Sequence, residues 1–183
     1  MQRQIDFEIS ADDYVAANRL HARLIYFSWR GLRALVIVWL LYTLVAVAIG
    51  GQWTLAGILP ILAGTAIGTP IIALAILGIN ALLLARRTRR LFDQQRSLHG
   101  KMMAKWNEAG LQLTSPNGSG IHEWSDFIKW AESKTILLFY QNDMLFNLVP
   151  QRALDAEQLE DIKTALRAQG VRQAGRPRTD NSA

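Results

Sequence analysis

Hydrophobic and polar positions divide the chain into a long apolar middle and two polar ends. From Ala34 to Ala85 the sequence runs for 52 residues without Asp, Glu, Lys, Arg or His. Outside this window the pattern changes, and residues 5–9 alternate apolar and acidic side chains as a half-buried strand does. A soluble domain spreads its charges along the chain. The pattern therefore predicts a membrane-spanning segment between two polar segments.

The uncharged window is long enough to cross a bilayer twice, because one spanning helix needs roughly 20 apolar residues. We expect a transmembrane hairpin over residues 31–86, with spans at residues 32–50 and 58–85. A buried helical hairpin of a soluble protein is the alternative. It is disfavoured because a core helix keeps a polar stripe on one face, and neither segment has one.

Arginines flank the hairpin, and its short turn carries no Lys or Arg. Since cytoplasmic loops are enriched in basic residues, both termini are expected in the cytoplasm. The same arginines form a basic flank that we expect to meet anionic lipid headgroups of the bilayer. The members of this flank are Arg30, Arg33, Arg86, Arg87, Arg89 and Arg90.

The formal net charge of +5 does not indicate a nucleic-acid partner. Residues 86–105 carry seven basic side chains and one acid, whereas residues 106–183 carry eight basic side chains and ten acids. The positive excess thus lies beside the apolar window, where membrane topology explains it. No nucleic-acid partner is expected.

The polar ends predict one α+β domain that the hairpin interrupts. Residues 1–30 read as a cytosolic strand and helix, with Ser10 as the helix N-cap. Residues 87–170 read as a cytosolic antiparallel sheet closed by one helix. Residues 136–140 read as one of its strands, and Gly118-Ser119-Gly120 reads as a hairpin turn. The helix begins at Asp155, with Gln158 in a capping box, and Gly170 is its expected C-cap. Residues 171–183 are rich in Arg, Pro and small polar residues and are expected to be disordered.

No arrangement of residues indicates catalysis, a cofactor or a metal, so a non-enzymatic protein is expected. The chain has no cysteine, and its three histidines lack the spacing of metal ligands. Trp106, Trp124 and Trp130 are compatible with an aromatic groove or with core packing. Core packing is favoured, because aromatic residues are good strand formers.

Within the second span, Gly64 and Gly68 form a GxxxG pattern, which lets helices approach closely. Packing inside the hairpin and formation of a homo-oligomer explain it equally well.

Three segments together resemble the YcxB-like family of bacterial membrane proteins. They are IDFEISADDYVAANRLH, the hairpin directly after it, and WSDFIKWAESKTILLFYQNDMLFNLVPQRAL. The resemblance extends over about residues 3–169. It implies a pleckstrin-homology-like (PH-like) cytosolic domain, interrupted by the hairpin, whose N-terminal strand joins the later sheet. With the orientation above, it implies a multi-pass protein of the bacterial inner (plasma) membrane. The resemblance implies no particular reaction, ligand or functional residue.

We therefore expect a membrane-anchored adaptor or binding module with a protein or peptide partner on the cytosolic side. The alternative is an accessory subunit of a transporter or envelope complex.

Overall fold

The computed structural model describes residues 2–51 and 53–175, except for the side chain of Arg30. The chain divides into two compact units: residues 1–21 with 86–183, and residues 22–85. The helices and strands, in chain order, are β1 (Gln4–Glu8), α1 (Ala11–Tyr26), α2 (Trp29–Gly50), α3 (Leu55–Gln94), the 3-10 turn η1 (Arg96–Leu98), β2 (Lys101–Trp106), β3 (Gly110–Ser115), β4 (Gly118–Glu123), η2 (Trp124–Asp126), β5 (Lys129–Glu132), β6 (Ile136–Tyr140), β7 (Phe146–Pro150), η3 (Gln151–Ala153), α4 (Ala156–Ala168) and β8 (Arg172–Gln173).

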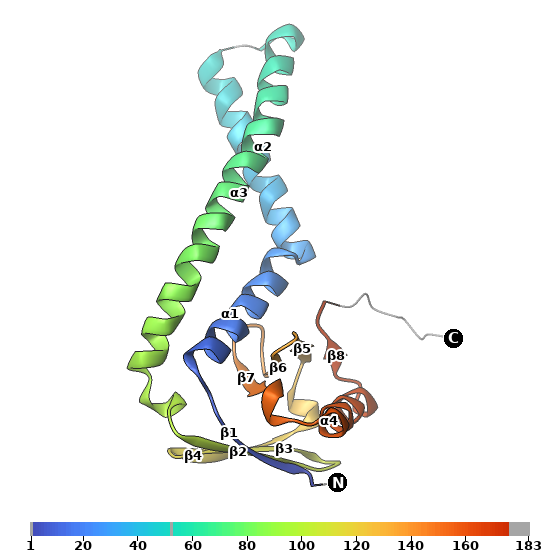
Figure 1. Cartoon of the computed structure of the whole chain (residues 1–183). Coiled ribbons are helices and arrows are strands. Elements are labelled where there is room, and N and C mark those ends of the chain that lie inside the picture. The colour runs from blue at the N-terminus through green and yellow to red at the C-terminus, as the bar shows by residue number, and fades with distance from the viewer. Residues whose placement is uncertain (1, 52, 176–183) are drawn as a thin grey trace, which may run out of the picture. The chain divides into compact units, whose positions relative to one another are not determined.

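The N-terminal strand joins the sheet that follows the apolar segment, as predicted. β1 lies beside β2 (Figure 1). The two strands pair antiparallel, and Ile5 lies opposite Ala104. The first sheet has the strand order β1-β2-β3-β4. A five-residue strand is unstable alone, so β1 depends on β2. One compact unit is therefore built from the two ends of the chain.

The expected single sheet is wrong, because the strands form two sheets. The second sheet has the order β7-β6-β5-β8. The chain leaves the first sheet at η2, where the Glu123 and Asp126 side chains cap each other's backbone N–H groups. Trp124, fully buried, donates its indole N–H to the Asn107 carbonyl at 2.9 Å. The turn η2, held by these hydrogen bonds, lies between β4 of the first sheet and β5 of the second sheet.

The expected disorder from residue 171 onward is wrong for residues 171–175. β8 pairs in parallel with β5, and Trp130 donates its indole N–H to the Val171 carbonyl at 3.1 Å. The Ala174 N–H donates to the Trp130 carbonyl at 2.7 Å. A two-residue strand has no sequence period of its own, so only these contacts define it. Residues 176–183 lie outside the described residues.

The closing helix α4 begins and ends as predicted. Asp155 and Gln158 form a reciprocal capping box at its N-terminus. Gly170 follows with a φ of +69°, and the Val171 N–H donates to the Leu166 carbonyl at 2.9 Å. This is the Schellman arrangement, which glycine adopts at no steric cost.

The three tryptophans pack in the core, as favoured from the sequence. Trp124 and Trp130 are fully buried, and Trp106 is almost so. Each indole N–H has a hydrogen-bond acceptor, and that of Trp106 is Asp161 Oδ2 at 2.7 Å. Buried tryptophans with paired N–H groups stabilise a core and leave no aromatic groove.

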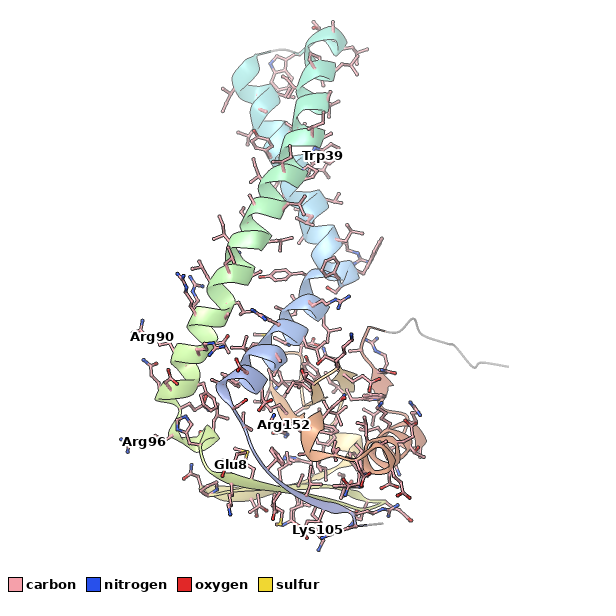
Figure 2. The ribbon with its side chains drawn as sticks, viewed as in Figure 1. Glu8, Trp39, Arg90, Arg96, Lys105 and Arg152 are labelled. Carbon is pink, nitrogen blue, oxygen red and sulfur yellow. The ribbon has the colours of Figure 1, made fainter. Side chains whose placement is uncertain are left out.

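The N-terminal strand and helix are fastened to distant parts of their unit. Arg152 donates to the Glu8 carbonyl at 2.7 Å and forms an ion pair with Asp13 (Figure 2). The Asp13 N–H donates to the Ser10 hydroxyl at 3.2 Å, which confirms Ser10 as the cap of α1, and Asp13 Oδ2 accepts from the Ser10 N–H and hydroxyl at 2.8 and 2.7 Å. The pKa of Asp13 is affected most by partial burial, which raises it, but hydrogen bonds from Arg152 and Ser10 lower it below its usual value.

The second unit contains two helices that are long and apolar enough to cross a membrane. The 22 residues of α2 extend ~33 Å at 1.5 Å per residue, which matches a hydrocarbon core of ~30 Å. Within the unit, the hydroxyls of Thr43 and Thr65 lie 3.0 Å apart and are buried. Helix α3 runs through Pro60 and Pro70 and continues past the apolar segment to Gln94.

Candidate functional site

A groove of about 720 Å³ lies within the unit formed by the two chain ends. Its walls come from the first sheet, from β7 and the turn before it, from α1 and from η1. Figure 1 shows these elements. The volume falls in the range of about 300–1,000 Å³ typical of ligand sites. This groove is the candidate functional site.

The groove is uncharged and is lined by apolar and neutral polar residues. Met102, Leu113, Phe146 and Leu148 contribute apolar wall, and no described lining residue is Asp, Glu, Lys or Arg. Placing a charge in such a site is costly unless a partner neutralises it. The site therefore suits a ligand that is uncharged over the part that enters.

β4 presents glycines to this groove. Gly118, Gly120 and His122 alternate on one face of the strand, opposite Ser115, Leu113 and Leu111 of β3. A Cβ added at Gly118 would meet no atom within 4 Å, and one at Gly120 would meet only the His122 imidazole, at 3.0 Å. The missing side chain at Gly118 leaves open space, whereas the His122 ring covers Gly120.

His21 of α1 forms part of the wall and packs on two aromatic rings. Its Nδ1 lies 3.2 Å from the Tyr140 hydroxyl, and its ring centroid lies 5.1 Å from that of Phe146. Burial first, then the nearby Lys129, lowers the pKa of His21, and Asp143 partly opposes this. Burial raises the pKa of Tyr140 to about 12. Both effects favour a neutral wall at neutral pH.

Two lining residues carry a buried polar atom with no hydrogen-bond partner in the described part of the chain: Asn147 Nδ2 and Thr114 Oγ1. Asn147 pairs with Phe139 of β6 and shares its face of the second sheet. Thr114 pairs with Met103 and Ser119, on the opposite face from the glycines of β4. Buried amides are nearly always paired, so Asn147 offers a donor to a ligand.

The predicted basic flank does not contribute to the groove. Arg89 forms an ion pair with Asp12 at 2.5 Å, and the Arg33 guanidinium lies 5.3 Å from the centre of the Trp29 ring. Arg86, Arg87 and Arg90 are exposed, and Figure 2 marks Arg90. The side chain of Arg30 lies outside the description. None of the five arginines whose side chains are described lines the groove.

The glycines of the GxxxG pattern do not pack inside the hairpin. A Cβ added at Gly64 or Gly68 would meet no atom within 4 Å. Helix contact in this unit includes the neighbouring Thr65 instead, through its hydroxyl to Thr43.

Sequence reasoning missed the groove and its residues. It read Gly118-Ser119-Gly120 as a turn, whereas the turn precedes Gly118 and these residues open β4. Alternation of glycine with a polar residue was the available signal, since a strand can carry glycines on one face. Nothing in the sequence around Asn147 indicated that its Nδ2 atom would be buried without a hydrogen-bond partner in the described part of the chain.

Comparison with known proteins finds one family model that matches part of the chain. The model of the YcxB-like protein family matches residues 106–166, about a third of the chain. No curated protein and no solved structure matches the chain. The matched residues run from the end of β2 to the last turns of α4. The resemblance to the YcxB-like family is thereby confirmed over residues 106–166.

Proposed function

We propose that this protein is a non-enzymatic adaptor, anchored in the bacterial inner membrane, whose cytoplasmic PH-like domain binds a segment of another protein. The uncharged groove between the two sheets carries this proposal. A four-stranded antiparallel sheet, three further antiparallel strands and a C-terminal helix support the proposal of a PH-like domain. The YcxB-like match covers much of that domain.

The exposed surface of the hairpin unit supports the membrane anchor. Ile37, Leu44 and Leu74 are 56%, 60% and 68% exposed, and many other large apolar side chains of α2 and α3 are similarly open. A soluble protein rarely exposes so continuous an apolar surface. Lipid covers it in this proposal. The basic flank, Arg86, Arg87, Arg89 and Arg90 included, then meets anionic headgroups.

Topology is tested with reporter fusions. A reporter at Trp53 is expected on the far side of the membrane and a reporter at the C-terminus in the cytoplasm. The same location for both would refute a two-span hairpin with cytoplasmic termini.

Binding is tested with a photoreactive amino acid in the full chain in cells. Placed at Met144, which lines the groove and is 73% exposed, it is expected to crosslink one protein reproducibly. Placed at Glu157 in the first turn of α4, outside the groove, it is expected to give no such product. Equal products at both positions, or none at Met144, would count against an adaptor that uses this groove.

An accessory subunit of a transporter or envelope complex is the second candidate. The open space beside Gly64 and Gly68 favours it, because a helix of another chain can approach there. The double variant Gly64→Leu with Gly68→Leu is then expected to reduce the size of the complex on a native gel. An unchanged size would remove the main support for this candidate.

A further inference from the structure

The groove runs along the free edge of β7. Phe146, Asn147 and Leu148 of β7 line it, as do Met144 and Leu145 just before the strand. β7 is the outermost strand on its side of the second sheet. Such a strand presents unpaired backbone N–H and C=O groups.

Of the other outer strands, β1 and β8 offer less free edge than β7, whereas β4 is itself an outer strand of six residues. β1 has its Glu8 carbonyl occupied by Arg152 at 2.7 Å, and Gln158 donates to the Gln2 carbonyl just before the strand at 2.9 Å. β8 has only two residues. β4 lines the groove with Gly118 and Gly120, and these residues have no side chain that would obstruct a strand bound beside β7.

The side chains around this space define what would fit. A strand placed beside β7 would direct alternate side chains toward the bare glycines of β4, and the uncharged wall requires these to be apolar or neutral. The unpaired Nδ2 of Asn147 requires an acceptor, and a peptide carbonyl supplies one. A lipid acyl chain has no acceptor along its length.

We propose that an extended, uncharged segment of a partner protein adds as a new strand to the free edge of β7. Its inward side chains fill the space beside Gly118, next to the His122 ring, and one of its carbonyl oxygens accepts from Asn147 once the amide turns toward the groove. This is β-strand addition, in which backbone hydrogen bonds provide affinity and alternate side chains provide specificity. The inference rests on the proposed adaptor function and specifies its ligand.

The probe is a randomised library of displayed nine-residue peptides, selected on the full chain in lipid nanodiscs. The enriched peptides are expected to be uncharged and apolar at alternate positions. N-methylation of alternate backbone amides in a selected peptide is expected to weaken binding at least tenfold, because it removes strand hydrogen bonds. Amide exchange in β7 is expected to slow when the unmodified peptide is bound.

Variants separate binding from folding. Asn147→Leu and Asn147→Asp are expected to weaken the selected peptide about five- to tenfold, as loss of one buried hydrogen bond does. Gly120→Val is expected to abolish binding, because its side chain enters the groove and displaces only the flexible His122 ring. Gln112→Leu, on the opposite face of the first sheet beside the exposed Ile121, is the control and is expected to bind normally. Unfolding temperatures verify that each variant folds.

Three results would overturn strand addition: no enriched peptide, enrichment of charged peptides, or unchanged binding after N-methylation. Displacement of the peptide by a fluorescent fatty acid, with no effect of Asn147→Leu, would assign the groove to acyl chains instead. Crosslinking at Met144 distinguishes failure of strand addition from failure of the adaptor function. A specific crosslink together with failure of the N-methylation test leaves the adaptor intact and rejects strand addition alone.

Discussion

Arg3 and Asp161, 158 positions apart in the chain, form two hydrogen bonds of 3.0 Å each, from Nε and Nη2 to the two carboxylate oxygens. Asp161 also accepts from the Trp106 indole at 2.7 Å. One carboxylate thus joins the residue just before β1 to β2 and α4. Partial burial raises the pKa of Asp161, but the hydrogen bonds from Arg3 and Trp106 outweigh this and lower it below the usual value.

Replacing Asp161 is expected to destabilise the unit formed by the chain ends. Asp161→Ala leaves the nearly buried Trp106 N–H without its acceptor, and loss of such a bond costs about 1–3 kcal/mol. Glu160→Ala is the matched control, since its ion pair with Arg167 is exposed and contributes about 0–1 kcal/mol. Thermal unfolding followed by tryptophan fluorescence measures both. Equal destabilisation by Glu160→Ala would contradict a specific stabilising role for the hydrogen bonds of Asp161.

The unit should fold without the hairpin, provided that β1 is present. Residues 1–26 joined by a glycine-serine linker to residues 86–183 are expected to give a soluble, cooperatively unfolding domain. Residues 86–183 alone should not, because β2 would lose five paired residues and expose its apolar face. Near-ultraviolet circular dichroism and amide exchange compare the two. Equal cooperativity would mean that β1 is dispensable.

His21 makes the free energy of unfolding depend on pH. Its lowered pKa means that the folded state prefers the neutral ring, so its contribution is complete above the unfolded value of about 6.5. The contribution is lost as the pH falls through the lower pKa of the folded state. His21→Gln is expected to flatten the decline that begins near pH 6.5. An unchanged slope in the variant would show that another group titrates there.

Asp13 and Asp161 also have lowered pKa values, and their effect belongs to a different pH range. Each stabilises the fold above its usual pKa of about 3.9, and this stabilisation disappears as the pH falls further. The acid transition is therefore expected in two stages. Asp13→Asn should remove part of the lower stage and leave the stage near pH 6 unchanged, as measured by unfolding temperature against pH.

Within the hairpin, Thr43 and Thr65 are expected to stabilise helix pairing modestly. Their hydroxyls lie 3.0 Å apart, and such bonds in membranes average about 0.6 kcal/mol. Thr69→Val is the control, because Thr69 Oγ1 is buried with no partner in the described part of the chain and its loss should be neutral. A double-mutant cycle of Thr43→Val and Thr65→Val in bicelles measures the pair. Coupling near zero would show that the two hydroxyls act independently.

Local signals in the sequence predicted most of the individual elements. The N-cap at Ser10, the capping box at Asp155, the C-cap glycine at Gly170 and the strand at residues 136–140 depend on neighbours within a few positions, and the structure has them all. The apolar window likewise predicted two helices of spanning length. Each of these features follows from periodicity or from hydrogen bonds inside one turn.

Tertiary contacts decided how the elements assemble. Division of the strands into two sheets depends on Trp124 reaching the Asn107 carbonyl, and β8 depends on Trp130 and the edge of β5, contacts that join distant positions. The groove arises in the same way. Gly118 and Gly120 become its floor, and Asn147 its unpaired donor, only after two sheets from different parts of the chain face each other. Periodicity assigns a residue to a face of its own element, whereas burial and partners depend on which other element covers that face.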